Sequence, residues 1–196
     1  MIIAYVLLSY IVGSIPAGYI LYKLSDKKDI RRFGSQATGA TNVLRLKGWT
    51  YAIPVALFDI LKGLFIMYFA LELFQDNRWV LVCGFLVVLG HCFPIFIKFR
   101  GGKGVATAIG VYAVLSPISL LCSLGIFLAI VLLTRYVSLG SLVAVFSYPL
   151  FVLLFTGEYA TVLLGLMIWC LITVRHKSNI QRLVVGKERK LADKIT

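Results

Sequence analysis

Carboxylate and imidazole side chains are scarce in this chain. Its 196 residues include 8 aspartates and glutamates and 2 histidines, whereas 20 lysines and arginines give a net charge of +12. Metal centres are built from clusters of histidine, cysteine and carboxylate side chains, and the sequence has no such cluster. The cysteines stand singly in apolar runs without a Cys-x-x-Cys spacing. Neither a disulfide nor a metal site is therefore expected from Cys83, Cys92, Cys122 and Cys170.

Three catalytic patterns are also missing. No Gly-x-Ser-x-Gly nucleophile elbow occurs. The His-x4-Asp pattern of acyl-CoA-dependent acyltransferases is absent, because the fifth residue after His91 is Phe96 and the fifth after His176 is Gln181. The Gly-Gly-Lys-Gly stretch is not a Walker loop, since its lysine is followed by glycine rather than by serine or threonine.

Long apolar runs are abundant instead. Hydrophobic residues make up 60% of the chain, charged residues 14%, and the mean hydropathy is +0.94. This composition is typical of an all-α, polytopic membrane protein. Linkers, low-complexity tracts and repeats are absent, so residues 1–196 are predicted to form one membrane-embedded domain. The positive charge then indicates contact with anionic membrane lipids rather than with nucleic acid.

The apolar segments predict seven transmembrane helices. Pro16 lies inside the first and is expected to kink it. A single helix over 104–134 would be about 46 Å long, against a hydrocarbon core of about 30 Å. Leu115-Ser116-Pro117 can turn the chain near the middle of this stretch, so two short spans are predicted there. The predicted spans are 1–22, 52–74, 79–97, 104–116, 118–134, 138–156 and 158–174.

The basic residues predict the orientation. With the N-terminus outside and the C-terminus in the cytoplasm, every lysine and arginine lies inside except Arg78, in an outer link, and Lys62, within a span. The opposite orientation would violate the positive-inside rule.

Two polar stretches on the cytoplasmic side are rich in donors. Glycines in the turn Gly101–Gly104 let the backbone approach a ligand, and helix-start N–H groups beside Lys103 would form an anion site. A simple membrane-flanking turn is the alternative. The loop after the first span supplies hydroxyl, amide and guanidinium donors, while a flexible linker with capping hydroxyls fits it equally well. Its candidate residues are Ser35, Thr41, Asn42 and Arg45.

Charged residues also occur within or near the spans. Asp59 and Lys62 are three residues apart in the second span and can pair on one helical face. Because an unpaired charge in the bilayer is costly, we expect a structural pair beneath the site rather than direct catalysis. His91 is expected to be a hydrogen-bonded packing residue rather than a base.

Two further stretches follow later spans. The first contains Arg135, Ser138 and Ser141, and the second runs from Arg175 through His176 and Asn179 to Arg182. On one continuous helix, Arg175, Asn179 and Arg182 would share a face. Stop-transfer charges are the alternative for both stretches. We expect all four polar stretches to meet in one basin at the lipid–cytoplasm boundary, suited to a substrate with an anionic head and an apolar tail.

Specific motifs run through these stretches. They are Gly34-Ser35 with Gly39-Ala40-Thr41-Asn42, Asp59-x-x-Lys62-Gly63, Gly90-His91-x-Phe93-Pro94 leading into Gly101-Gly102-Lys103-Gly104-Val105-Ala106-Thr107, Arg135-Tyr136-x-Ser138, and Arg175-His176-x-x-Asn179-Ile180-x-Arg182-Leu183-x-x-Gly186. Together they resemble the bacterial acyl-phosphate:glycerol-3-phosphate acyltransferases, the PlsY family. One departure is Gln36-Ala37, where that family usually has Gly-Asn.

The resemblance implies seven spans with an outside N-terminus in the bacterial inner membrane and an active site on the cytoplasmic face. It implies acyl transfer from acyl phosphate to the 1-hydroxyl of glycerol 3-phosphate, giving lysophosphatidate and phosphate. This is the first acylation step of phospholipid synthesis, and no cofactor, metal or acyl-CoA is implied.

By matched position, acyl phosphate is assigned to Ser35, Thr41, Asn42 and the turn Gly101, Gly102 and Gly104. Glycerol 3-phosphate is assigned to Arg45, Lys103, Ser141, His176 and Asn179. Of these, Ser35, Arg45, Lys103 and His176 are predicted to be catalytic. Supporting roles are assigned to Asp59, Lys62, His91, Arg135 and Arg182.

No general base is evident, because the assembled polar stretches contain no carboxylate. We expect the leaving phosphate to accept the hydroxyl proton, with His176 or His91 as the alternative. Two other functional classes stay open. A small-anion transporter would place polar groups at the bilayer midplane, whereas here they gather at one face. The remaining class is a non-catalytic membrane subunit.

Overall fold

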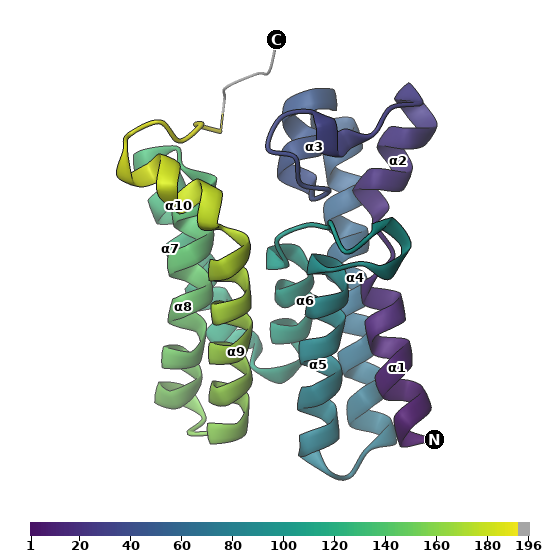
Figure 1. Cartoon of the computed structure of the whole chain (residues 1–196). Coiled ribbons are helices and arrows are strands. Elements are labelled where there is room, and N and C mark those ends of the chain that lie inside the picture. The colour runs from purple at the N-terminus through teal and green to yellow at the C-terminus, as the bar shows by residue number, and fades with distance from the viewer. Residues whose placement is uncertain (192–196) are drawn as a thin grey trace. The chain divides into compact units, whose positions relative to one another are not determined.

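The computed structural model describes residues 1–191, and every regular element in that part is helical (Figure 1). The predicted all-α class is confirmed. Before the glycine turn the elements are α1 Ile2–Gly13, α2 Ala17–Asp26, the 3₁₀ turn η1 Ile30–Arg32, α3 Ala40–Lys47, α4 Trp49–Leu73, α5 Asn77–Cys92 and the 3₁₀ turn η2 Ile95–Ile97. After it come α6 Val105–Leu115, α7 Pro117–Thr134, α8 Val137–Phe155, α9 Tyr159–Arg175 and α10 Lys177–Val184.

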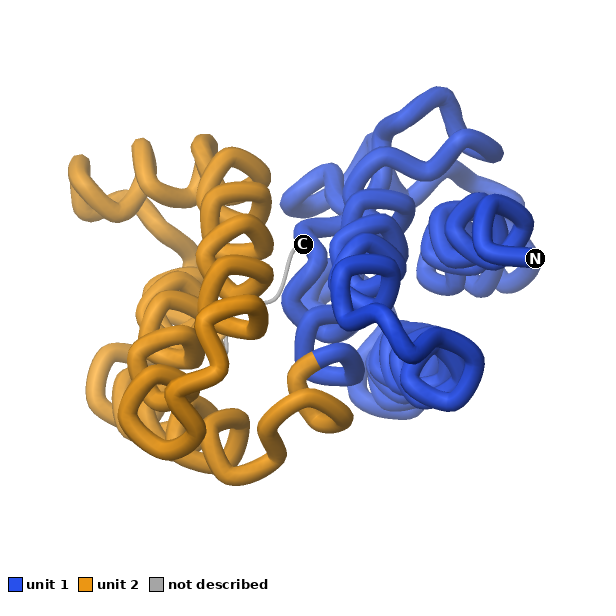
Figure 2. The backbone as a smooth tube through the Cα atoms, turned by 90° about the horizontal axis from the view of Figure 1, so that it is seen from below, with its two compact units in different colours: residues 1–111, 194–196 blue, residues 112–193 orange. Residues whose placement is uncertain are grey.

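Two compact units make up the chain (Figure 2). The first comprises residues 1–111 and the second begins at residue 112, so the division falls within α6. Each unit is a bundle of packed helices. A single domain over 1–196 stays a prediction, and its last five residues lie outside the described part.

Close helix packing organises the first unit, where α5 contacts both α1 and α4. Glycines make this possible, because a Cβ at Gly90 would lie 2.3 Å from the carbonyl oxygen of Tyr10. A Cβ at Gly63 of α4 would lie 2.3 Å from the carbonyl oxygen of Thr107 of α6. Small residues at such crossings let helix backbones approach in a membrane, where apolar burial alone gives little preference for helix over lipid.

The first span is interrupted where Pro16 was expected to kink it. Helix α1 ends at Gly13, and α2 begins at Ala17, directly after the proline. Proline lacks a backbone N–H and cannot continue the ladder of helical hydrogen bonds. The carbonyl of Ile15, in the gap, instead accepts a hydrogen bond from Lys62 Nζ at 3.2 Å.

The long apolar stretch 104–134 divides as predicted. Helix α6 ends at Leu115, Ser116 separates the two helices, and Pro117 takes the first position of α7, where its missing N–H costs nothing. The predicted third span, 79–97, corresponds to the apolar segment Asn77–Ile97, within which α5 ends at Cys92 and the chain turns through η2 before Lys98. Pro94 explains why α5 ends at Cys92, because Phe93, the residue before this proline, is disfavoured in a helical conformation.

Within residues 1–191, five helical segments are long and apolar enough to cross a membrane, or six if the bent pair α9–α10 counts as one span. Their outer faces carry exposed apolar side chains such as Phe65 and Leu132, as lipid contact requires. Helix α6 has 11 residues and is shorter than each of these membrane-crossing segments. Seven crossings and the orientation of the termini therefore stay predictions.

In the second unit α8 contacts both α7 and α9. Helix α9 ends at Arg175, and α10 continues after His176 at an angle of 66°. The expectation of one continuous helix is wrong here, so Arg175 does not share a helical face with Asn179. Asn179 and Arg182 do share a face of α10, because they lie three residues apart on one helix.

Candidate active site

A buried ion pair lies in the first unit. Lys62 Nζ is 2.7 Å from Asp59 Oδ1, one turn apart on α4, and each side chain is only 2% accessible. The predicted pairing is confirmed. His91 of α5 joins it, with Nδ1 2.9 Å from Lys62 Nζ and 3.3 Å from Asp59 Oδ1. The three side chains connect α4 with α5. The contact of His91 with this ion pair was not predicted from the sequence.

The glycine turn folds back onto His91. The N–H of Gly102 donates to the His91 carbonyl at 3.0 Å, and the N–H of Gly101 donates to the Cys92 carbonyl at 3.2 Å. A Cβ at Gly102 would lie 2.0 Å from His91 Nε2. The first two glycines are therefore required by packing against the chain itself. Their N–H groups are directed at the carbonyls of Cys92 and His91, and the assignment of these glycines to acyl phosphate stays a prediction.

The anion-binding capacity of this turn lies just beyond those glycines. Gly104 has φ +94°, a conformation that side chains disfavour, and α6 starts at the next residue. Backbone N–H groups in the first turn of a helix lack intrahelical acceptors and carry the positive end of its dipole. Lys103, half-buried, lies two residues before the first residue of that helix. A cation and a helix N-terminus thus occur together, as the sequence predicted.

Asn42 organises the first loop from within. Its Oδ1 accepts from the Ser35 N–H at 2.9 Å, and its Nδ2 donates to the carbonyls of Phe33 at 3.2 Å and Ala37 at 2.9 Å. The side chain is buried. The polar atoms of Asn42 therefore hold the loop closed. From the sequence, this side chain was expected to bind the substrate instead. Gln36, inside this loop, has φ +59°, a conformation for which the glycine usual in the family is better suited.

The other first-loop candidates flank this closed loop. Thr41 and Arg45 lie four residues apart on α3 and therefore share one face of that helix. Thr41 is exposed and Arg45 is half-buried. Ser35 is half-buried directly beside the Asn42 amide, with its backbone fixed by that side chain. The loop thus presents preorganised hydroxyl and guanidinium groups.

A carboxylate that the sequence analysis missed organises the second unit. Glu188 Oε1 accepts from Ser138 Oγ at 3.0 Å and from Asn179 Nδ2 at 2.6 Å, while Oε2 accepts from Arg182 Nε at 2.8 Å. Only 2% of the Glu188 side chain is accessible. It lies in a basic tail that carries no helical or motif signal, although Gly186 ends the last motif two residues earlier.

Electrostatics fix the charge of this carboxylate. Burial raises the pKa of Glu188, but the hydrogen bonds from Asn179, Arg182 and Ser138 outweigh it and leave that pKa below its ordinary value. Glu188 is thus ionised at neutral pH. Its contacts join the tail to α8 and α10.

The remaining candidates of the second unit are held locally. Ser141 Oγ donates to the Val137 carbonyl at 2.8 Å, one turn back on α8. His176 is buried, with Nδ1 2.8 Å from the Ile172 carbonyl. A proton on Nδ1 satisfies that contact and places the basic lone pair of a neutral ring on Nε2. Arg135 ends α7 with φ +63°, and its carbonyl accepts from the Leu191 N–H at 2.9 Å.

The candidates fall into two groups. The first unit holds the first-loop residues, the glycine turn with Lys103, and the Asp59–Lys62–His91 network. The second holds Ser141, His176 and Asn179 with their neighbours Arg135 and Arg182. A common basin for both groups stays a prediction.

Comparison with known proteins agrees with the motifs. The family model described as glycerol-3-phosphate acyltransferase matches residues 3–186. The chain belongs to this family. The match covers every candidate residue from Ser35 to Arg182.

Relatives and solved structures of the family match nearly end to end. The glycerol-3-phosphate acyltransferase of Geobacter sulfurreducens is 45% identical over 93% of each chain, and that of Thermoanaerobacter pseudethanolicus is 40% identical over 96% of this chain and 94% of the relative. The crystal structure of PlsY (YgiH), an integral membrane glycerol 3-phosphate acyltransferase, in its glycerol 3-phosphate form, superimposes with a TM-score of 0.93 at 39% identity. It covers 96% of this chain and 94% of PlsY. The lysophosphatidic acid form gives a TM-score of 0.89.

The Glu188 contacts predict a pH-dependent contribution to stability. Because the folded pKa is lowered, this contribution is fully present above the ordinary value of 4.5 and is lost as pH falls through the folded pKa. Glu188→Gln should lower the free energy of unfolding by about 1–2 kcal/mol at pH 7. Thermal unfolding in detergent between pH 7 and pH 3 measures the stability of both proteins. The difference in stability between wild type and Glu188→Gln should become smaller as the pH falls. Glu158→Gln, in an exposed link, is the control, and equal effects of both variants would contradict the prediction.

Proposed function

We propose that this chain transfers an acyl group from an acyl phosphate to the 1-hydroxyl of glycerol 3-phosphate, giving lysophosphatidate and inorganic phosphate. One observation carries the proposal: the family match is continuous through both groups of candidate residues. The glycerol 3-phosphate and lysophosphatidic acid forms of PlsY are named for a substrate and a product of this reaction class. Neither the acyl donor nor the position of acylation follows from those names.

The residue inventory suits this chemistry. The substrate hydroxyl oxygen attacks the acyl carbon, the bond between that carbon and the phosphate oxygen breaks, and phosphate leaves with the electron pair. Phosphate is already a good leaving group, so the protein must hold two anions together, orient the hydroxyl and stabilise the developing oxyanion. Cations and neutral donors perform these tasks, and the reaction needs no metal or cofactor.

We assign roles by position and by contacts. Ser35, Thr41 and the start of α6 after Gly104 bind the acyl phosphate. Arg45 and Lys103 of the first unit, with Ser141, His176 and Asn179 of the second, bind glycerol 3-phosphate. Asn42 holds the loop that carries Ser35 rather than a substrate, because its carbonyl and amide are used within that loop.

The leaving phosphate itself is the proton acceptor in this proposal. His91 is unsuited to be a base, since Nδ1 faces Lys62 and Nε2 faces the backbone of Gly102. His176 is the alternative base, because the contact of Nδ1 with Ile172 directs its basic lone pair to Nε2. Glu188 is paired with three donors and ionised, which makes it a structural anion.

Kinetics of histidine variants separate the two proton acceptors. If phosphate is the acceptor, His176→Ala should raise KM for glycerol 3-phosphate and lower kcat by about tenfold or less, because only a binding contact is lost. The pH–rate profile should then keep its shape. His176→Asn, which retains a donor at the ring position, serves as the matched variant. A fall in kcat of several orders of magnitude with unchanged KM would establish His176 as the base instead.

The acyl donor is tested directly. Purified protein in detergent or nanodiscs is given palmitoyl phosphate or palmitoyl-CoA with glycerol 3-phosphate, and lysophosphatidate is followed. We expect product from the phosphate donor alone. Lys103→Ala should lower kcat/KM by about 10²–10³, as loss of an electrostatic contact in a dry site does. Lys98→Ala, at an exposed position of the same turn, is the control and should be nearly neutral.

The other results of that assay have defined meanings. Product from the CoA donor alone would contradict the donor assignment. No product from either donor, with a folded preparation, would favour the small-anion transporter or the non-catalytic subunit.

The proposal includes a topology of seven crossings with an outside N-terminus, a cytoplasmic C-terminus and a cytoplasmic active site in the bacterial inner membrane. Helix α6, 11 residues long, would cover only about 16 Å of a core of about 30 Å. The glycine turn would then lie below the membrane surface. Irregular backbone at that depth is tolerated when protein covers it, and Gly101, Gly102 and Gly104 are buried.

Cysteine labelling tests this topology. In a cysteine-free background, Glu158→Cys in the α8–α9 link should react with a membrane-impermeant maleimide in intact cells. Lys187→Cys, in the tail, should react only after the cells are opened. Both positions are exposed in the folded chain, so reactivity reports the side of the membrane. The reverse labelling pattern would invert the orientation, and identical labelling of both sites would require an even number of crossings between them.

A further inference from the structure

A strained loop precedes the glycine turn in the first unit. Lys98 and Phe99 both have φ +58°, a left-handed conformation that non-glycine side chains disfavour and that rarely occurs at consecutive residues. Both side chains are exposed, so their own packing does not explain the conformation. At its base the loop is closed by the bond from the Gly101 N–H to the Cys92 carbonyl. Such strain persists only where surrounding contacts impose it.

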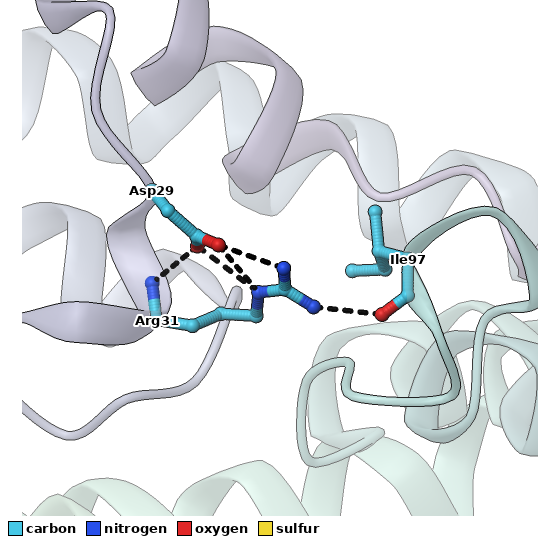
Figure 3. Close-up of polar contacts among 3 residues, drawn as sticks. All are labelled: Asp29, Arg31 and Ile97. Atoms are coloured by element: carbon cyan, nitrogen blue, oxygen red, sulfur yellow. Dashed lines mark hydrogen bonds and ion pairs between the residues drawn. The ribbon is translucent and has the colours of Figure 1, made fainter.

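Arg31 supplies a contact at the tip of this loop. Its Nη1 donates to the carbonyl of Ile97 at 2.7 Å, across 66 residues of sequence (Figure 3). Ile97 is the last residue before the left-handed pair, and its side chain is buried. The carbonyl that Arg31 fixes therefore sets the starting direction of the strained turn.

The guanidinium of Arg31 is itself fixed. Asp29 Oδ1 accepts from Nε at 3.0 Å and Asp29 Oδ2 accepts from Nη2 at 2.7 Å, which is a two-point contact along one edge (Figure 3). The ring of Tyr19 lies 5.1 Å from the guanidinium carbon. The planar guanidinium group of arginine can contact a carboxylate at two points and still donate to a third group. The ammonium group of lysine lacks this geometry, so lysine cannot replace Arg31.

The pair is anchored in the core beneath the first loop. Asp29 Oδ1 also accepts from the Arg31 N–H at 2.9 Å, which caps the 3₁₀ turn η1. Ile30 between them is fully buried and packs in a cluster with Tyr22 and Val43. The hydrogen bond from Arg31 lowers the pKa of Asp29 below its ordinary value, so the contact is charged at neutral pH.

We infer that Arg31, oriented by Asp29, is a positioning residue that sets the glycine turn, and with it Lys103, in register with the first loop that carries Ser35. Asp29 and Arg31 both lie outside the family motifs, the first of which begins at Gly34. The inference rests on the proposed function for its kinetic consequence, whereas its structural consequence is independent of the reaction.

The test compares Arg31→Gln with Arg32→Gln, using the full chain in nanodiscs. Both remove one positive charge from the same 3₁₀ turn, but Arg32 is exposed, whereas Arg31 donates to the Ile97 carbonyl. Hydrogen–deuterium exchange of peptides covering 93–104 reports the loop without any substrate. Acyl transfer from palmitoyl phosphate gives kcat and KM for both substrates.

Arg31→Gln should speed exchange in 93–104 by about tenfold or more and lower kcat/KM by about 10–100-fold, with a raised KM for glycerol 3-phosphate. Arg32→Gln should change neither by more than about twofold. Arg31→Lys should resemble Arg31→Gln, and Asp29→Asn, which preserves volume and leaves Arg31 in place, should give a smaller effect in the same direction. The Asp29→Asn variant keeps the test decisive if Arg31→Gln does not fold.

Each other outcome overturns a defined statement. Unchanged exchange in 93–104 in both Arg31→Gln and Asp29→Asn would show that the contact does not hold the loop. Faster exchange with kinetics equal to those of Arg32→Gln would show that the contact is structural only and would overturn the positioning role. A wild-type protein without acyl transfer would contradict the proposed function and the positioning role that depends on it, while the exchange arm still decides whether Arg31 holds the loop.

Discussion

The buried ion pair between Asp59 and Lys62 is the interaction on which the first unit depends. An unpaired charge at the centre of a bilayer costs about 2.5–3.5 kcal/mol, so neither residue is tolerable without the other. Lys62 also binds His91 and the carbonyl of Ile15, which the proline-broken first span leaves without a helical donor. One ammonium group thus connects α4, α5 and the break between α1 and α2. Any chemistry at the glycine turn is built on this support, because Gly102 packs directly on His91.

Each polar stretch is closed by contacts within the protein before any substrate binds. Asn42 closes the first loop, His91 and Arg31 hold the glycine turn, and Glu188 ties the tail to α8 and α10. Irregular backbone near a membrane must satisfy its own polar groups, because lipid cannot. The same contacts preorganise the donors that remain, and preorganised donors are what transfer from an activated acyl donor requires.

Sequence patterns predicted the helical class and the breaks at Pro16 and Ser116. They also predicted the pairing of Asp59 with Lys62, because each of these depends on chemistry within a few residues. They failed where distant segments compete. Helices α9 and α10 bend apart at His176, and Asn42 turns inward to hold its own loop. No local signal distinguishes an amide that binds a ligand from one that binds three backbone groups.

The sequence by itself determined the apolar segments, the distribution of basic residues between them and the family, because hydrophobicity, charge and motif spacing are properties of the chain alone. Tertiary structure decided the partners of the polar groups. Glu188, which no motif marks in the basic tail, accepts hydrogen bonds from both Asn179 and Arg182. Arg31 donates to the carbonyl of Ile97, 66 residues away in the sequence. Hydrogen bonds between residues far apart in sequence depend on where folding places each backbone, and only the folded chain specifies that.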